Sequence, residues 1–161
     1  MSIVTSPLKS VVIKSKVEQD KLRSRIVHIG FGAFHRAHQA LYTDEMLEKT
    51  GSDWGICEIN IFSHGLIEQL RSQEHRYLVA EKGAEQTTVK MIGAIKESCH
   101  PTLDSIQSVL NKMAEEQVAI VSMTITEKGY CVDHASGKID QKNSLIQHDL
   151  AYPNEPKSAI G

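Results

Sequence analysis

Short apolar runs alternate along this chain with segments of helical periodicity. An apolar run at residues 26–29 precedes residues 33–49, whose apolar positions roughly follow a helical period and which Gly51 would end. A second apolar run, residues 54–62, precedes a short helical stretch at residues 66–73. This order of strand, helix and strand, in about 35 residues, is what a right-handed β-α-β crossover needs. The pattern therefore predicts an α/β fold.

Two further segments, residues 77–81 and 87–95, suit β structure, and the residues between them are turn material. We expect them to form a hairpin or two neighbouring strands that extend the sheet. Residues 1–24 have no sustained period, so we expect a surface arm that leads into the first strand. The residues after Tyr130 are expected to be mostly loop.

A helix and a strong strand complete the pattern. Pro101 opens the helix, and one of its faces is expected to belong to the core. The residues of that face are Leu103, Ile106, Val109, Leu110 and Met113. Residues 118–125 are β-branched and apolar enough to be buried on both faces of a sheet. With these elements the pattern predicts parallel strands near residues 25–30, 54–62 and 117–125.

Composition narrows the class of protein. The 161 residues correspond to about one domain, and the formal net charge of −2 gives no basic surface for nucleic acid. No apolar run approaches the ~18 residues that span a bilayer, so no membrane partner is expected. The three cysteines are odd in number and widely spaced, which favours reduced thiols in a cytoplasmic protein over a disulfide framework or a zinc site.

Residues 25–39, RIVHIGFGAFHRAHQ, carry the clearest chemistry in the sequence. Gly30 lets the chain turn sharply out of the strand, and Gly32 removes a Cβ where a pyrophosphate would otherwise meet a side chain. The amides that follow open a helix, whose N-terminal end attracts an anion. This predicts the first βα turn of an incomplete Rossmann-like domain with a mostly parallel sheet. The candidate cofactor-binding residues are Gly30, Phe31, Gly32, Ala33, Phe34 and His35.

His35 stands where the dinucleotide fingerprint G-x-G-x-x-G has its third glycine, which allows close packing of helix on strand. Either the helix stands off slightly or His35 has another role. His35 and His38 are three residues apart and could in principle grip a metal, but no third ligand has a fitting spacing. Hydrogen bonding and packing are favoured for them, and no metal is expected. His28, within an apolar run, is interpreted as a satisfied core histidine.

The second strand should end in the residue that contacts the adenosine ribose. Glu58 and Asn60 share a face by strand alternation, and Asn60 is nearer the carboxyl end, so Asn60 is the candidate. No arginine follows immediately to bind a 2′-phosphate, so NAD is favoured over NADP, although an amide excludes that phosphate less firmly than a carboxylate would. The alternative is that both residues merely solvate the strand end.

Two stretches, GFGAFHRAHQ at residues 30–39 and SMTITEKGY at residues 122–130, resemble the polyol-specific long-chain dehydrogenases, the mannitol dehydrogenase family. Members of that family carry His-Arg-x-His in place of the third glycine. Residues 53–58, 80–85 and 156–161 look most like the branch that interconverts D-fructuronate and D-mannonate, with mannitol or another hexitol as the alternative substrate. The resemblance implies NAD as cofactor, a small sugar acid or polyol as partner, and chemistry without a metal.

Residues 126–130 leave the last strand at its carboxyl end, where open α/β sheets bind ligands. Thr126 is a candidate cofactor-binding residue. By the resemblance, Glu127 matches a family glutamate that helps to relay the substrate proton; a solvated loop residue or an ion pair with Lys128 are the alternatives.

The resemblance also implies a helical C-terminal domain with a lysine general base, which the 161 residues do not include. We therefore expect an N-terminal fragment, residues 25–161 being part of the dinucleotide-binding domain, that is inactive by itself. Its exposed sheet surface would favour self-association. A non-catalytic nucleotide-binding module and a methyltransferase-like domain, which shares the glycine loop, are the alternatives from other classes.

Overall fold

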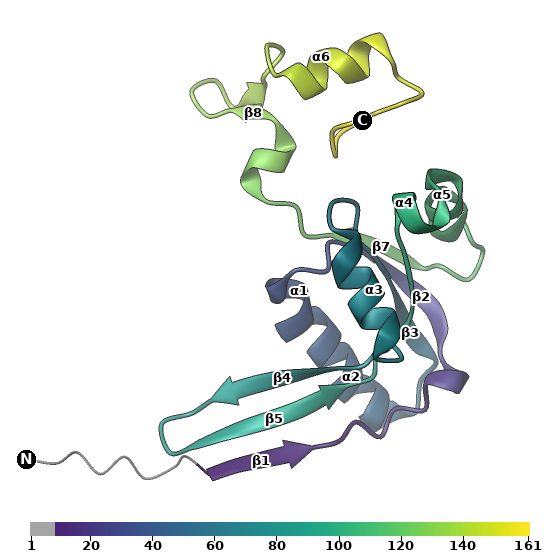
Figure 1. Cartoon of the computed structure of the whole chain (residues 1–161), viewed down its shortest axis with the longest axis vertical. Helices are drawn as coiled ribbons and strands as arrows, with labels where there is room; N and C mark the ends of the chain where they lie inside the picture. The colour runs from purple at the N-terminus through teal and green to yellow at the C-terminus, as the bar shows by residue number, and fades with distance from the viewer. Residues whose placement is uncertain (1–8) are drawn as a thin grey trace, which may run out of the picture. The chain divides into compact units, whose positions relative to one another are not determined.

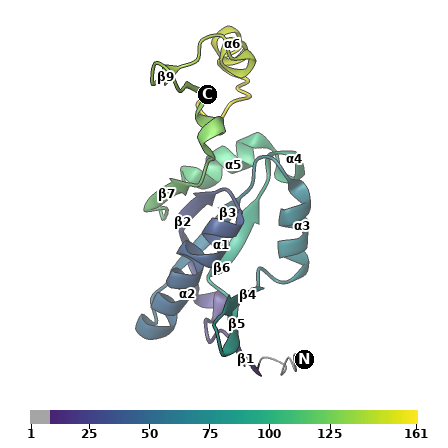
Figure 2. The same ribbon diagram turned by 90° about the vertical axis from the view of Figure 1, so that its left-hand side faces the viewer.

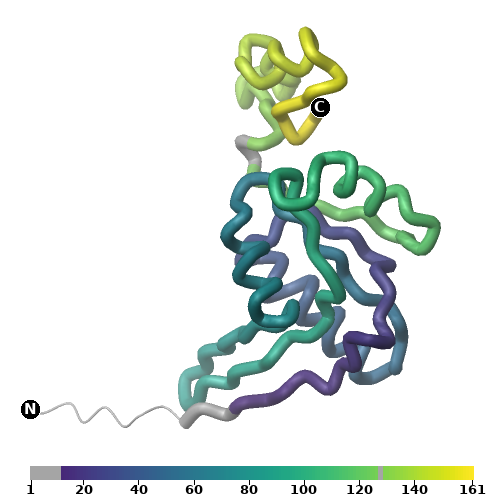
Figure 3. The backbone as a smooth tube through the Cα atoms, turned by 45° about the vertical axis from the view of Figure 1, so that its right-hand side comes forward, coloured from purple at the N-terminus to yellow at the C-terminus, as the bar shows by residue number. Residues whose placement is uncertain are grey.

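The computed structural model describes residues 9–161, and these form two compact units. The first unit ends at Met123, and the second comprises Thr124–Gly161. Figure 3 traces the backbone through both. None of the helices in the described part of the chain is long and apolar enough to cross a membrane.

The first unit is built on a four-stranded sheet in which every pair of neighbours is parallel (Figure 1). Its strands, in the spatial order β6-β3-β2-β7, are β6 (Ile95–Cys99), β3 (Trp54–Ile59), β2 (Arg23–Ile29) and β7 (Ile120–Met123). This confirms the mostly parallel α/β sheet that the hydrophobic pattern predicts. The strand β6 was not anticipated, because its first residue was assigned to the end of the preceding strand.

Helices connect the strands of this sheet (Figure 2). They are α1 (Ala33–Ala37), α2 (Gln39–Thr50), α3 (His64–Ser72), α4 (Pro101–Asp104) and α5 (Ile106–Met113). One core cluster joins Leu47 of α2 and Leu70 of α3 to Ile56 of β3. The other joins Val109 of α5 to Cys57, the next residue of β3. Since successive strand residues point to opposite faces, the sheet is covered by α2 and α3 on one face and by α5 on the other.

The single helix expected over residues 33–49 is interrupted at His38, which has φ −125° and ψ −84°. Side chains take up carbonyl groups that the break leaves without helical partners. The hydroxyl of Tyr77 donates to the carbonyl of Arg36 at 2.8 Å, and Nδ1 of His38 lies 3.0 Å from the carbonyl of Phe34. Gly51 ends α2 in the left-handed conformation, as expected.

A separate three-stranded sheet holds β1 (Lys9–Ile13), β5 (Gln86–Ile92) and β4 (Tyr77–Lys82). β4 and β5 form the expected antiparallel hairpin, but the expectation that they extend the main sheet is wrong. The chain changes sheets at Gly93, whose N–H donates to Oδ1 of Asp44 at 2.7 Å instead of to a neighbouring strand. The polar partner lies in α2, so the apolar pattern around residue 93 could not reveal the change.

The segment expected as a surface arm contributes to the structure. β1 pairs in parallel with β5, and the short helix η1 (Gln19–Lys21) follows it. Val17 and Leu22 are buried in the core cluster of α2 and α3. Residues 1–8 lie outside the described part of the chain.

The strand β7 does not have the burial that its sequence suggests. Ile120, Val121 and Met123 are 44%, 45% and 47% exposed, so the expectation of burial on both faces is wrong. β7 pairs with β2 on one side only, and no strand among residues 9–161 pairs with its other edge. The apolar side chains of β7 would suit a strand paired at both edges, and among residues 9–161 it is paired at one edge only.

The helix expected after Pro101 is divided at Ser105, which has φ +80°. The change of direction separates Leu103 from the face of α5, and the expected core face is largely exposed. Leu103, Ile106 and Leu110 are 37%, 59% and 47% exposed, whereas Val109 is 3% exposed. Only part of the periodic face is thus core.

The second unit, expected to be mostly loop, contains more regular structure. Its elements are η2 (Glu127–Tyr130), β8 (Val132–Asp133), β9 (Lys138–Ile139) and α6 (Ser144–Ala151). The side chain of Asn143 caps α6 by accepting a hydrogen bond from the N–H of Leu145 at 2.9 Å.

We expect Gly55→Ala to destabilise the first unit by about 1–3 kcal/mol, as overpacking does. A Cβ at Gly55 would lie 2.9 Å from Cβ of Leu22 and 3.1 Å from the carbonyl oxygen of Arg23, neither of which can rotate away. Gly65→Ala is the matched control, because a Cβ there meets nothing within 4 Å and lies in α3. Denaturant unfolding midpoints measure both; equal stability of the two variants would contradict the packing at Gly55.

Candidate functional site

The turn between β2 and α1, residues 30–34, is called the glycine turn below. Gly30 has φ +120°, a conformation that side chains rarely adopt, and its N–H donates to the carbonyl of Ile59 at 2.8 Å. Gly32 precedes α1, which no side chain caps. The backbone amides of Ala33 and Phe34 consequently have no acceptor among the described residues. The turn offers hydrogen-bond donors at the carboxyl end of a parallel strand.

The two faces of the glycine turn differ. Phe31 is buried inward, with its ring edge-to-face with Tyr77 at 5.7 Å and the guanidinium of Arg36 5.3 Å from its centre. Phe34 is 66% exposed. A Cβ added to Gly32 would meet only the carbonyl oxygen of Gly30, at 3.9 Å. Phe31 therefore anchors the turn, and the space outside Gly32 is open to a ligand.

Asn60 follows β3 and lies next to the turn, because the preceding residue, Ile59, accepts the N–H of Gly30. Its side chain is 7% exposed, and Nδ2 donates to the carbonyl of Ser63 at 2.9 Å. The carbonyl oxygen of the Asn60 side chain has no hydrogen-bond partner within residues 9–161. The structure thus brings an amide oxygen, available as an acceptor, beside the glycine turn.

A row of polar residues crosses the main sheet near the carboxyl ends of its strands. In register, His28 of β2 pairs with Glu58 of β3 on one side and with Ser122 of β7 on the other. His28 and Glu58 are buried, with 1% and 0% exposure. Both lie on the face of the sheet that α1 covers, so α1 meets polar groups where the other rows of the sheet are apolar.

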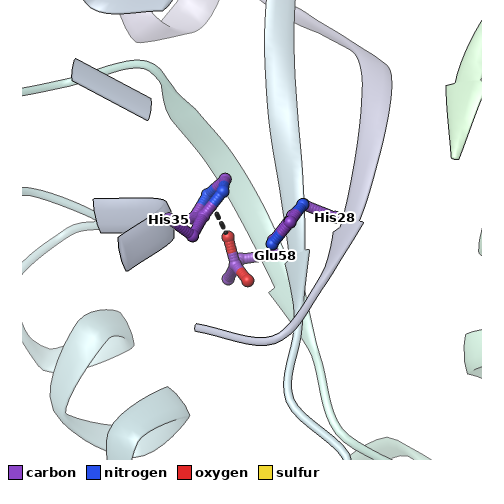
Figure 4. Close-up of side chains that lie close together, drawn as sticks. All are labelled: His28, His35 and Glu58. Carbon is purple, nitrogen blue, oxygen red and sulfur yellow. Dashed lines mark ion pairs between the residues drawn. The ribbon is translucent and has the colours of Figure 1, made fainter. Parts of the chain in front are cut away.

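His35 of α1 enters this polar row (Figure 4). Its ring stacks on that of His28, with centres 3.7 Å apart and planes inclined by 10°. Its Nε2 lies 2.8 Å from Oε2 of Glu58, and Nδ1 lies 3.2 Å from Oε1 of Gln39. Despite this short distance, Nε2 of His35 and both side-chain oxygens of Glu58 have no partner in hydrogen-bond geometry in the part of the chain that the structure describes. The position of the third fingerprint glycine is filled by a buried, polar contact.

Burial keeps these groups uncharged. It raises the pKa of Glu58 to about 9, against the opposing charge of Arg36. It lowers the pKa of His35 to about 4 and that of His28 to about 4. Although the distance is that of an ion pair, burial keeps the proton on the carboxyl group at pH 7, and the contact is one between two neutral groups. In these protonation states the carboxyl group carries the hydrogen of the contact, and Nε2 of His35 carries none.

The remaining hydrogen bonds fit this assignment. With Nε2 of His35 accepting, its Nδ1–H donates to Oε1 of Gln39. Nε2 of Gln39 donates to Oγ of Ser122 at 3.3 Å, and Oγ of Ser122 lies 2.9 Å from Nδ1 of His28. One chain of hydrogen bonds therefore runs from His35 of α1 through α2 to β7 and β2.

His28, His35 and Glu58 also resemble a three-ligand metal cluster, since one potential ligand atom from each lies within 4.8 Å of the others. The stacked rings argue against that use. Imidazole lone pairs lie in the plane of the ring, and two nearly parallel rings 3.7 Å apart cannot both aim at one ion at about 2.0–2.1 Å. The arrangement favours hydrogen bonding and packing, as the sequence suggested for His35.

Sequence reasoning brought Gly30, Phe31, Gly32, Ala33, Phe34, His35 and Asn60 to one site, and the structure places them together. Thr126 and Glu127 lie in the second unit, and the side chain of Glu127 is outside the described residues. The partnership of Glu58 with His35 was missed. Its signal was a polar residue inside each of the apolar runs that form β2, β3 and β7.

The family model for the Rossmann domain of mannitol dehydrogenase matches residues 24–161. The chain therefore belongs to the mannitol dehydrogenase family and comprises part or all of its Rossmann domain.

The relatives agree with this assignment. D-mannonate oxidoreductase of Escherichia coli K12 is 57% identical over 153 residues, 93% of this chain and 32% of that protein. The uncharacterized oxidoreductase YeiQ of the same organism is 52% identical over 99% of this chain and 33% of its own length. The solved ternary complex of Pseudomonas fluorescens mannitol 2-dehydrogenase with NAD and D-mannitol superposes with a TM-score of 0.83 at 37% identity, over 92% of this chain and 31% of that one. The chain spans about a third of the length of these relatives.

We expect acid to destabilise the first unit between pH 6.5 and pH 4. The lowered pKa values of His28 and His35, about 4 against 6.5, contribute stability that is present above pH 6.5 and lost as the pH falls through 4. On denaturant unfolding across this range the two histidines should together take up to two protons, and the proton that Glu58 releases offsets part of this uptake.

His35→Gln keeps hydrogen-bonding capacity without a titrating ring, and it should reduce this proton uptake by about one proton. His64→Gln, at an exposed histidine, is the control. An unchanged proton uptake in His35→Gln would contradict the burial of a neutral His35.

Proposed function

We propose that this chain is the NAD-binding part of an oxidoreductase that interconverts D-fructuronate and D-mannonate by hydride transfer. The observation that carries the proposal is the glycine turn, with its open space outside Gly32 and its unpaired amides, in a member of the mannitol dehydrogenase family. A relative from this family binds NAD in its solved ternary complex.

The chain's own residues fit a dinucleotide. The amides of Ala33 and Phe34 donate to the pyrophosphate, which approaches over Gly32, and buried Phe31 keeps the turn in place. The side-chain oxygen of Asn60 accepts a hydrogen bond from the adenosine ribose. The cofactor, when bound, supplies the hydride acceptor or donor.

We also propose roles for two residues of the second unit. Thr126 contacts the cofactor, and Glu127 relays the proton of the substrate hydroxyl to a general base elsewhere in the enzyme. Loss of that relay by Glu127→Gln would lower kcat and leave the dissociation constant of NADH unchanged.

The substrate proposal rests on degree of similarity. The 57% identity with D-mannonate oxidoreductase exceeds the 37% identity with mannitol 2-dehydrogenase. The alternative substrate is a hexitol, because the related mannitol 2-dehydrogenase forms a ternary complex with NAD and D-mannitol. Steady-state rates of the complete enzyme with NADH and either D-fructuronate or D-fructose separate the two; a higher kcat/KM with fructose would overturn the sugar-acid proposal.

A methyltransferase and a non-catalytic nucleotide-binding module are the alternatives from other classes. A methyltransferase usually has an acidic residue at the end of its second strand, where this chain has Asn60. Calorimetric titration with NADH and with S-adenosylmethionine distinguishes them. Binding of S-adenosylmethionine without binding of NADH would reject the oxidoreductase.

We expect Gly32→Val to weaken NADH binding by about tenfold or more, since a branched side chain would fill the approach of the pyrophosphate. Stability should change little, because the nearest atom to a Cβ at Gly32 is 3.9 Å away. Fluorescence titration with NADH measures the affinity.

The control is Gly55→Ala, which strains the sheet at a distance from the turn and should leave the affinity of folded protein unchanged. Wild-type affinity in a folded Gly32→Val variant would mean that the glycine turn does not hold the cofactor.

A further inference from the structure

Glu58 has no part in the proposed function, yet the burial of its carboxyl group carries a desolvation penalty. Its side chain is fully buried, and Nε2 of His35 lies 2.8 Å from Oε2, but neither oxygen has a partner in hydrogen-bond geometry among the described residues. A buried carboxyl group without a hydrogen bond is strongly destabilising. The contact is therefore needed by both side chains.

The same contact bears on the glycine turn, because His35 lies three residues after Gly32. α1 has only five residues and no side-chain cap, so few interactions fix its place. The hydroxyl of Tyr77 holds its end by donating to Arg36, and Glu58 holds its middle. In the standard fingerprint, a glycine at position 35 would bring helix and strand together by close packing alone.

We infer that Glu58 is a positioning residue, which keeps its proton and donates it in a hydrogen bond to His35, and so fixes the glycine turn against β3. The inference rests on the proposed function, because it takes the glycine turn to bind NADH. A carboxylate at this position has no hydrogen to donate to Nε2 of neutral His35, so the turn should loosen when Glu58 ionises.

The groups around Glu58 favour the neutral form. His28 faces it from β2, His35 and Arg36 from α1, and Tyr77 from β4, while Ser98 is its neighbour in register on β6. Arg36 is the charged member, and burial outweighs it, which raises the pKa of Glu58 to about 9.

The sign of the pH dependence follows from this shift. The folded pKa lies above the ordinary value of 4.5, so the stabilisation is complete below pH 4.5 and is lost as the pH rises through 9. Between pH 7 and 9 both histidines are neutral in the folded state, which leaves Glu58 as the titrating member of the cluster.

Three variants and one control test the inference. Glu58→Gln supplies an uncharged N–H donor for His35; Glu58→Leu removes the donor; His35→Gly restores the standard fingerprint. Glu68→Gln makes the same substitution at an exposed position on α3. Amide hydrogen exchange of residues 33–37 reports on α1 without any ligand, and NADH titration reports on the turn.

At pH 7 we expect Glu58→Gln and Glu68→Gln to match the wild type within about threefold in exchange rate and NADH affinity. Glu58→Leu and His35→Gly should exchange about tenfold faster in residues 33–37 and bind NADH about tenfold more weakly. Comparison of the wild type with Glu58→Gln between pH 7 and 9 remains decisive if the other two variants do not fold. The unfolding equilibrium of the wild type should shift by up to about tenfold per pH unit beyond that of Glu58→Gln.

Equal pH profiles for the wild type and Glu58→Gln, or wild-type exchange in Glu58→Leu, would overturn the inference. If the wild type fails to bind NADH while the exchange and pH results are as expected, the proposed function fails and the positioning of α1 by Glu58 stands.

Discussion

The buried contact between Glu58 and His35 is the interaction on which, as we infer, the position of the glycine turn depends. Buried polar groups are tolerated in protein interiors when each finds a partner, and here the partners come from different elements. His28 of β2 and Glu58 of β3 occupy one register row, and His35 of α1 closes over them. Polar contacts are directional, so the polar row favours one position of α1 on the sheet. Apolar contacts in the same place would allow several positions.

This constraint links the local chemistry of the turn to the whole sheet. The chain of hydrogen bonds passes from His35 through Gln39 to Ser122 in β7 and His28 in β2. The helix α1, which carries part of the glycine turn, is therefore joined to α2, β7 and β2 through side chains. Neutrality matters because three uncharged groups can be buried together, whereas one unpaired charge among them would be expensive.

Much of the main fold could be predicted from the sequence, because parallel strands and their helices have strong local patterns. The strands at residues 25–30 and 54–62 and the cap at Gly51 are examples. What could not be predicted depends on distant partners. The break at Gly93 depends on Asp44, and the exposure of β7 depends on its pairing at one edge only among residues 9–161. The turn residues were identifiable from glycine geometry, but the partner of His35 required knowledge of the strand register.

The protonation of the Glu58 and His35 pair tests this account most directly. Carbon-13 NMR of the Glu58 carboxyl group and nitrogen-15 NMR of the His35 ring report the two proton positions separately. The account predicts at pH 7 a protonated carboxyl group beside an imidazole protonated only at Nδ1, with the carboxyl titrating near pH 9. A carboxylate beside an imidazolium, with both ring nitrogens protonated, would contradict it.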